Sequence, residues 1–407
     1  MTPAVKLQFR DLLLSVYLPS VLMSIGQMAL VVILPLYMIS RGDSLSTAAL
    51  VFAMRSVGST LINLPASAAI ARFGIRAGML CGISMIGIGA LLVALADSSL
   101  LIAGATLIFG AGMGTWLLSR LAFITRHVAA RERGRSMSTL AGIQRLGLLI
   151  GPFVGGLSAA SLGFRWVFFF IMCCALLNLA LVMLFSSAGR ADRRQGQTVL
   201  PSQSNLFTLL PRILYRHRQI FLGAGVFVFC LQMVREQRHL LITLWGAFIG
   251  LDTGVIGAVV SGAAMLDLAM FPIAGYVMDH HGRKLAGIIC IVILAIALGL
   301  LRLTDTFALY LAVVLLAAFG NGLGSGIMLT LGSDFAPEQD SSQFLGVWRI
   351  FSDMGSFSGP ALTSLCASLS LALGLSAIIG VVGALALCFR VAETLPANPA
   401  TLPRDAE

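Results

Sequence analysis

The chain has 407 residues, of which 58% are hydrophobic and 11% are charged, and its formal net charge is +10. This composition excludes a water-soluble globular protein, because such a protein needs far more polar surface to cover its core. Long apolar runs separated by short charged segments instead predict an all-α membrane protein, in which each helix satisfies its own backbone hydrogen bonds inside lipid.

Twelve apolar segments predict twelve transmembrane helices. They lie near residues 12–39, 46–70, 77–96, 99–120, 137–161, 164–187, 219–248, 254–278, 285–303, 307–333, 344–368 and 371–392. Each segment is long enough to cross about 30 Å of hydrocarbon at about 1.5 Å per residue. Residues 1–10 lead into the first segment without a small-residue cleavage site, so we expect a retained first helix rather than a removed signal peptide.

Basic residues are concentrated in the connections that follow even-numbered segments. The odd-numbered connections contain only Arg41, Arg165 and Arg302. This positive-inside pattern predicts a multi-pass protein of the cell inner (plasma) membrane with both termini in the cytoplasm. The alternative explanation of the net charge, a nucleic-acid partner, is disfavoured because the charges follow membrane topology. We therefore expect the lipid bilayer, and no nucleic acid, as a partner.

One long polar segment divides the chain. The predicted domains are an N-terminal six-helix bundle at 1–188, a cytoplasmic linker at 189–218, a C-terminal six-helix bundle at 219–393 and a cytoplasmic tail at 394–407. The second part of the linker is amphipathic and basic, which is typical of a helix lying on the anionic inner leaflet.

The two halves repeat at a constant offset of 208 residues. Gly151-Pro152 matches Gly359-Pro360 at this spacing, and so do several other glycine pairs, among them Gly147 with Gly355, Gly112 with Gly320, Gly114 with Gly322 and Gly74 with Gly282. An ungapped repeat of six helices predicts two pseudo-symmetric six-helix bundles, with a site between them near the bilayer midplane.

The loop after the eighth segment, GYVMDHHGRK, resembles a loop signature of the major facilitator superfamily, G-x-x-x-D-R-x-G-R-K, with His280 in place of the usual arginine. The equivalent loop after the second segment has Ser67 and Ala71 where the signature has glycine and aspartate. The resemblance covers essentially the whole chain and implies the major facilitator fold. The gate residues that it implies are Gly275, Asp279, Gly282, Arg283 and Lys284, together with Arg72, Gly74 and Arg76 in the first half.

Such a loop can act as a cytoplasmic latch. An aspartate beside the amino terminus of another helix is stabilised by that helix's dipole and free N–H groups. By the repeat, Asp279 should face the start of the fifth segment, near Arg133, Arg135 and Ser136. The alternative is an ordinary tight turn with positive-inside charges. The adjacent His280 and His281 lack a third ligand at suitable spacing, so we expect no metal site.

The fifth segment contains GLLIGPFVGG, which is similar to the antiporter signature of the same family. The matching residues are Gly147, Gly151, Pro152, Gly155 and Gly156, whereas Ser138 stands where the earliest glycine is expected. In the family this pattern implies exporters that exchange substrate for protons. The alternative is pure helix packing, because glycines permit close approach and proline kinks a helix.

Nine ionisable residues lie inside the predicted spans, where each costs several kcal/mol unless it pairs or faces a wet cavity. They are Arg55, Arg145, Arg235, Glu236, Arg238, His239, Asp267, Arg349 and Asp353. Four of them cluster at 235–239 in the seventh segment, on one side of a helical wheel with Gln237 pointing away. Their sidedness favours one continuous helix with a polar stripe over a break between two shorter segments.

These residues divide into two predicted roles. We assign a substrate cavity to the five arginines, and we assign proton coupling to Glu236 and His239 first, then to Asp353, then to Asp267. Because arginines outnumber acids by two, the cavity favours an anionic or zwitterionic organic substrate. The alternative for Arg145 and for the i, i+4 pair Arg349–Asp353 is a structural ion pair that stabilises one conformation.

The sequence contains no phosphate-binding loop, nucleophile elbow or zinc-binding motif, so we expect a non-enzyme without cofactors. The seven cysteines lie in predicted spans, so we expect apolar filling rather than disulfides. The leading hypothesis is a monomeric secondary active transporter that exports a small organic compound by proton antiport and alternating access. The alternatives are proton-coupled uptake of an organic anion and a membrane sensor that kept the fold but lost transport.

Overall fold

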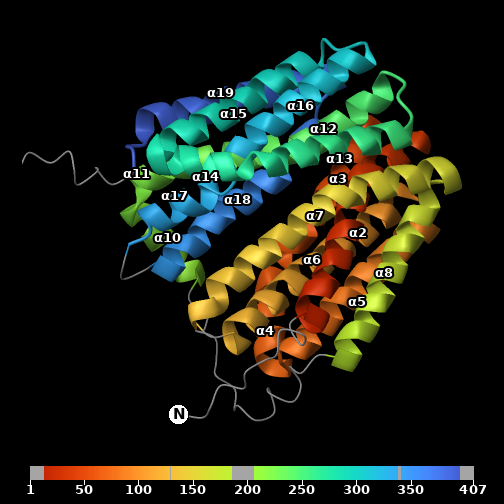
Figure 1. Ribbon diagram of the computed structural model, residues 1–407, viewed down its shortest axis with the longest axis horizontal. Coiled ribbons are helices and arrows are strands. Elements are labelled where there is room, and N and C mark those ends of the chain that lie inside the picture. The colour runs from red at the N-terminus through yellow and green to blue at the C-terminus, as the bar shows by residue number, and fades with distance from the viewer. Residues whose placement is uncertain (1–12, 129, 186–205, 338–340, 395–407) are drawn as a thin grey trace, which may run out of the picture.

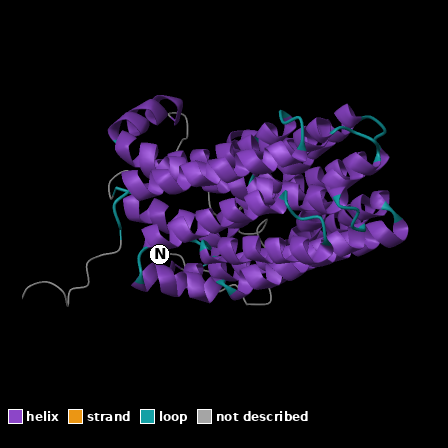
Figure 2. Cartoon of the chain, turned by 90° about the horizontal axis from the view of Figure 1, so that it is seen from above, coloured by secondary structure: helices purple, strands orange, loops and turns teal. Residues whose placement is uncertain are grey.

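The computed structural model describes residues 13–128, 130–185, 206–337 and 341–394, and these ranges form helices joined by short connections (Figures 1 and 2). No β-strand occurs within them. The prediction of an all-α membrane fold is confirmed. The predicted linker lies partly outside the described residues, and the predicted tail lies almost entirely outside them.

The N-terminal half begins with a π-helical turn and continues with seven α-helices. They are η1 (Leu13–Tyr17), α2 (Leu18–Ser40), α3 (Leu45–Leu61), α4 (Asn63–Phe73), α5 (Ile75–Leu95), α6 (Ser99–His127), α7 (Ala130–Leu162) and α8 (Phe164–Phe185). Ser44 and Ser98 cap α3 and α6 with their hydroxyl oxygens, which accept from backbone N–H groups in the first turn.

The C-terminal half is entered through two short helices and a second π-helical turn. Its elements are α10 (Leu206–Arg216), α11 (Arg218–Ile220), η3 (Phe221–Gly225), α12 (Val226–Phe248), α13 (Thr253–Ala269), α14 (Phe271–His280), α15 (Arg283–Leu301), α16 (Phe307–Leu323), α17 (Ile327–Phe335), α18 (Ser341–Ser364) and α19 (Leu369–Arg390). The helix α10 occupies the part of the linker that was predicted to be amphipathic.

Ten helical segments of the described chain are long and apolar enough to cross a membrane, and the bent pair α3 and α4 makes an eleventh. The 24-residue α18 lies where the eleventh of the twelve predicted segments lies. Its polar side chains, among them Arg349 and Asp353, make it less apolar than the other spans. A hydropathy count therefore misses α18 although it has the length of a membrane span.

Three of the predicted spans are broken in the structure, and two of the breaks coincide with residues that interrupt helices. The pair α3 and α4 bends by 43°. Pro272 lies in the first turn of α14, where its missing N–H leaves no hydrogen bond unmade. Between α16 and α17, Gly326 adopts a φ of +87°, which a residue with a side chain rarely adopts.

The two halves repeat in three dimensions at the offset found in the sequence. Gly74 and Gly282 both have positive φ, at +91° and +101°, and each directly precedes a helix. A Cβ built on Gly151 would lie 2.6 Å from the carbonyl oxygen of Ile25, and one on Gly359 would lie 2.7 Å from that of Met233. Because Ile25 and Met233 are themselves 208 residues apart, the same helix contact occurs in both bundles.

The two bundles lie side by side and converge toward one end of the molecule (Figure 1). We call this the narrow end; it carries the α2–α3, α7–α8 and α12–α13 connections. Here α7 packs against α13, α3 against α18, and α2 against α12. The other end, which we call the wide end, carries the α4–α5 and α14–α15 connections.

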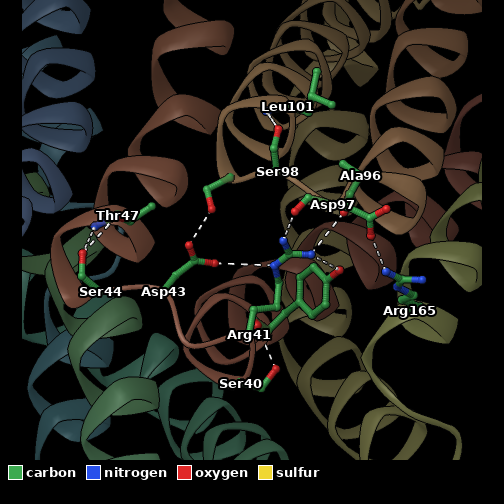
Figure 3. A network of polar contacts seen from close by, with 12 residues as sticks. Ser40, Arg41, Asp43, Ser44, Thr47, Ala96, Asp97, Ser98, Leu101 and Arg165 are labelled. Atoms are coloured by element: carbon green, nitrogen blue, oxygen red, sulfur yellow. Dashed lines mark hydrogen bonds and ion pairs between the residues drawn. The ribbon is translucent and has the colours of Figure 1, made fainter.

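Arg41 ties together connections of the N-terminal half at the narrow end (Figure 3). Its guanidinium donates to the carbonyl oxygen of Ala96 at 3.2 Å and to that of Asp97, and it pairs with Asp43 at 3.5 Å. Arg165, at the start of α8, pairs with the Asp97 carboxylate at 2.8 Å. Arg41 and Arg165 are two of the three arginines in the odd-numbered connections. Both thus form contacts inside the N-terminal bundle that hold its helices together.

Candidate functional site

A cavity of about 400 Å³ lies between the two halves. Residues from α2, α7, α12, α13, α16 and the α16–α17 turn line it, so both bundles form its wall. The polar and charged lining residues are Ser24, Gln27, Gln144, Arg145, Gln232, Arg235, Glu236, Arg238, His239, Asp267, Asn321 and Ser325. Six of the nine predicted intramembrane residues therefore meet at one cavity, and Arg55 reaches it through Glu236.

The charged cluster of the seventh segment lies within one uninterrupted helix, α12. The prediction of a polar stripe is confirmed, and a water-exposed break is excluded. Gln237, expected to point away from the cluster, is fully buried on the other side of α12 and contacts α18 near Gly359. Arg235, Glu236, Arg238 and His239 all line the cavity.

An ion pair joins the two halves at the cavity. Arg55 of α3 donates through Nη2 to Oε2 of Glu236 on α12 at 2.7 Å, and the two side chains are only 12% and 15% exposed. Gln232, one turn before Glu236, donates to its other oxygen at 3.4 Å and to the Ser356 hydroxyl on α18 at 3.0 Å. The carboxylate is thus held by side chains of α3 and α12, and its charged partner comes from the opposite bundle.

A second ion pair lies entirely within the C-terminal half. Arg238 of α12 and Asp267 of α13 are 3.6 Å apart, with side chains 8% and 7% exposed. Asn321 of α16 donates to the same Asp267 oxygen at 2.5 Å. This cluster links three helices of one bundle, so its contacts stay intact if the two halves move as rigid bodies.

Two arginines at the cavity form no ion pair with any described carboxylate. Arg235 donates to the carbonyl oxygen of Gly324 at 2.9 Å and approaches the Met328 sulfur at 3.4 Å. Arg145 of α7 lies over the ring of Phe271 at 4.0 Å, and this ring belongs to α14 of the opposite half. Asp267, which pairs with Arg238, also attracts Arg145 electrostatically, so two acids, Glu236 and Asp267, serve four arginines at the cavity.

The structure does not bring Arg349 and Asp353 to the cavity. They pair with each other along α18 at 3.6 Å, and their side chains are 44% and 26% exposed. The alternative of a structural ion pair fits this geometry. Sequence reasoning also missed Arg120, which is 5% exposed on α6 and lies at the boundary of the predicted fourth segment.

Neutral amides at the site were also missed. Asn321, Gln232, Gln27 and Gln144 line the cavity, and the first two hold the acids of both ion pairs. The available signal was an amide side chain inside an otherwise apolar segment. Only ionisable residues were considered as candidates, although an amide in lipid also needs a partner.

The second-half gate loop is anchored to the end of its own bundle. Glu393, just after α19, accepts from the backbone N–H groups of Arg283 at 2.9 Å and Lys284 at 3.0 Å, so it caps the amino terminus of α15. The Arg283 side chain pairs with Asp334 at the end of α17 at 2.9 Å. Asp279 is exposed. Its predicted latch to the fifth span stays a prediction, because the side chains of Arg133 and Arg135 are not among those that the structure describes.

The first-half gate loop is tied in a parallel way. Arg76, at the start of α5, donates to the carbonyl oxygen of Met183 in the last turn of α8 at 2.7 Å. Arg72 lies over the ring of its neighbour Phe73 at 5.3 Å, and Gly74 supplies the positive φ between α4 and α5. In each bundle the loop after the second span therefore contacts the end of the sixth.

The glycine motif of α7 packs against both halves. Gly147 and Gly151 of α7 pack against α2, next to Ser24 and Ile25. At the narrow end, a Cβ built on Gly156 would lie 2.9 Å from the Gly257 Cα of α13, across the interface. The motif therefore serves close helix packing and also forms part of the contact between the bundles.

Comparisons with known proteins agree with this architecture. The sequence profile of the Major Facilitator Superfamily matches residues 16–247 and 237–406. A multi-drug resistance efflux pump PmrA homolog of Lactococcus lactis subsp. lactis is 24% identical over 313 residues, which cover 71% of this chain and 69% of that protein. The MFS-type transporter ucsD of an Acremonium species is 26% identical over 171 residues, which span 42% of this chain and only 28% of its relative.

Solved structures share the fold at low sequence identity. A POT family transporter in complex with a thioalcohol-conjugated peptide superposes with a TM-score of 0.75 and 14% identity, covering 93% of this chain and 95% of the other. A D-xylose-proton symporter superposes with a TM-score of 0.72 and 17% identity, covering 95% and 98%. With the profile match across both halves, this chain belongs to the Major Facilitator Superfamily, whose members are membrane transporters and not enzymes.

Proposed function

We propose that this protein is a secondary active transporter of the inner membrane that exports a small organic compound by proton antiport and alternating access. The observation that carries the proposal is the ion pair between Arg55 and Glu236, which joins the two halves at the wall of a polar cavity. The similarity to an efflux pump over 69% of that pump's length supports export.

The wide end faces the cytoplasm in this proposal. The gate loops at that end carry Arg72, Arg76, Arg283 and Lys284, which the positive-inside rule assigns to the cytoplasmic side. The bundles meet at the narrow end (Figure 1), and in this proposal the cavity is reached from the opposite, cytoplasmic end. Substrate enters there, and the periplasmic path is closed by α3, α7, α13 and α18.

Glu236 couples the proton to the movement of the halves. An arginine at 2.7 Å stabilises the ionised carboxylate, so closing the narrow end brings Arg55 to Glu236 and expels a proton into the cavity on the cytoplasmic side. When the narrow end opens, Arg55 moves away with its own bundle and Glu236 takes a proton from the periplasm. One cycle thus carries a proton inward while substrate moves outward.

Glu236 suits this role better than the other acids. The partners of Asp267 are Arg238 and Asn321 of the same bundle, and the partner of Asp353 is Arg349 of the same helix. Rigid-body movement of the halves leaves these contacts unchanged. The Arg55–Glu236 contact breaks and re-forms with that movement, as a coupling site requires.

The test uses proteoliposomes containing a pH-sensitive dye and a panel of fluorescent organic anions, zwitterions and cations. Wild-type protein should move protons against one of these compounds. Glu236→Gln should abolish proton-driven transport and retain counterflow exchange, whereas the control Asp353→Asn, an acid outside the cavity, should retain both. Driven transport that survives Glu236→Gln would remove this residue as the coupling acid, and co-directional proton flux would show uptake.

A further inference from the structure

The charged side chains at the cavity leave a surplus of positive charge. Arg55 is neutralised by Glu236 and Arg238 by Asp267, at 2.7 and 3.6 Å. Arg145 and Arg235 face the same cavity without an ion-pair partner among the described residues. Asp267 is shared between Arg238 and Arg145, so two acids serve four arginines at the cavity, and the remaining positive charge at membrane depth favours binding of an anion.

Arg235 is held in place by neutral groups. Its Nη2 donates to the Gly324 carbonyl oxygen at 2.9 Å, at the turn between α16 and α17, and its Nη1 lies 3.4 Å from the Met328 sulfur. These contacts fix the direction of the guanidinium but do not cancel its charge. The side chain is half-buried, so water screens that charge less than at a protein surface.

Arg145 is oriented from the opposite half. The face of its guanidinium lies 4.0 Å from the centre of the Phe271 ring, a cation–π contact between α7 and α14. Stacking occupies a face of the planar group and leaves the N–H donors at its edge available. Those edge donors match the two oxygens of a carboxylate in a bidentate hydrogen bond.

Arg145 lies within electrostatic range of Arg235, which repels it, and of the Asp267 carboxylate, which attracts it and also pairs with Arg238. Arg145 and Arg235 come from opposite bundles, because α7 belongs to the N-terminal half and α12 to the C-terminal half. An anionic group between them would remove the repulsion and bridge the halves. The geometry points to a site for one oxyanion, made of one arginine from each bundle.

We propose that the transported compound is an organic carboxylate whose charged group binds between Arg145 and Arg235. The inference rests on the proposed function, since it names the substrate class of the same cavity. The remainder of the cavity is mixed: Gln27, Gln144 and Gln232 offer hydrogen bonds, while Met28, Leu148 and Leu268 offer apolar contact. A volume of about 400 Å³ suits a small molecule that combines a carboxylate with an apolar body.

The experiment compares matched compounds that differ only in charge. Thermal unfolding of the purified full-length protein in detergent is measured with 4-phenylbutyrate, 4-phenylbutyramide and 4-phenylbutylammonium, and with 3-phenylpropylphosphonate, which has the same carbon chain as the butyrate, as the phosphorus oxyanion. The carboxylate should raise the midpoint temperature in a concentration-dependent way, and the amide and the ammonium compound should not. Equal shifts for all compounds, preference for the cation, or no shift with 4-phenylbutyrate would overturn the proposal. Preference for the phosphonate would retain an oxyanion site and overturn the assignment to a carboxylate.

Variants assign any such effect to the two arginines. Arg145→Gln and Arg235→Gln should each weaken 4-phenylbutyrate binding by about tenfold or more, because each removes a hydrogen bond between charged groups. Arg145→Lys and Arg235→Lys, which keep the charge, separate this loss from misfolding. Arg349→Gln, an arginine in a span outside the cavity, should bind as the wild type does; an equal loss in this control would contradict the assignment.

Transport assays on the same protein distinguish failure of this inference from failure of the proposed function. Proton-driven movement of 4-phenylbutylammonium, with no binding of the carboxylate, would retain the transporter and refute the anion site. Specific binding of 4-phenylbutyrate without proton-linked flux would retain the anion site and refute proton antiport.

Discussion

Replacing Gly156 with alanine adds one methyl group at the narrow end, where α7 meets α13. The new Cβ would lie 2.9 Å from the Gly257 Cα and 2.9 Å from the Thr253 carbonyl oxygen. Both are backbone atoms of the opposite half and cannot move away as a flexible side chain would. Since carbon atoms pack best at about 3.5–4.0 Å, the two helices must separate by about 0.6 to 1.1 Å.

Overpacking of this kind costs about 1–3 kcal/mol, and it is relieved when the narrow end opens. The equilibrium between the two conformations should therefore move by about 5- to 150-fold toward the state that is open at the narrow end. Alanine also favours the helical backbone over glycine by about 1 kcal/mol, but this gain is the same in both conformations and cancels. Gly142→Ala is the matched control, because it lies on the same helix with nothing within 4 Å of its added methyl group.

The assay measures the distance between two spin labels, attached to cysteines at Leu162 and Phe248. Both side chains are well exposed, at 65% and 68%, and they lie at the narrow end on opposite halves. The exposed native cysteines are first replaced; these are Cys81, Cys173 and Cys388. Gly156→Ala should increase the population at the longer distance, and Gly142→Ala should match the parent. Identical distance distributions for both variants would refute the packing argument.

Three further predictions concern ion pairs and helix ends. Arg55→Gln should destabilise the conformation closed at the narrow end by about 3 kcal/mol, because it leaves Glu236 without its charged partner. In the same spin-label assay, the double variant with Glu236→Gln should recover part of this loss. Glu393→Gln should lower stability by about 1 kcal/mol in thermal unfolding, because it weakens the cap of α15. Asp305→Asn, which removes an exposed acid in the α15–α16 connection, should have no effect there. Arg41→Ala should cost about 2 kcal/mol of stability without changing the spin-label distances, since its contacts lie within one bundle; a changed distance distribution would contradict that reading.

Hydropathy and the internal repeat were enough to predict the architecture. The constant offset is also found in three dimensions as matched contacts: Gly151 of α7 packs against α2, and Gly359 of α18 packs against α12. What hydropathy could not predict is where a span bends, since an average over many residues is insensitive to one peptide unit. The break after α16 depends on the left-handed conformation of Gly326, which has no signature in apolarity.

The charged residues of the site could be found from the sequence, but their partners could not. A charge stands out in an apolar segment, so Glu236 was identified as a candidate and only its partner was uncertain. That partner is Arg55, distant by 181 positions, and neither of the adjacent arginines of α12 pairs with it in the described chain. The reason is geometric: Arg235 turns toward the α16–α17 turn and Arg238 toward α13, so the carboxylate is left to the opposite bundle.

The distribution of contacts explains how one proton can act on the whole molecule. Within each bundle, ion pairs and capped helix ends bind the helices into a unit, as Arg238 with Asp267 and Glu393 at α15 show. Between the bundles, the contacts of polar and charged side chains include the Arg55–Glu236 pair, the stacking of Arg145 on Phe271, and a hydrogen bond from Ser46 to the Ser364 carbonyl oxygen. Opening the narrow end separates Arg55 from Glu236, and protonation of Glu236 weakens this ion pair. A proton can bias the equilibrium because it acts on a contact that the two conformations do not share.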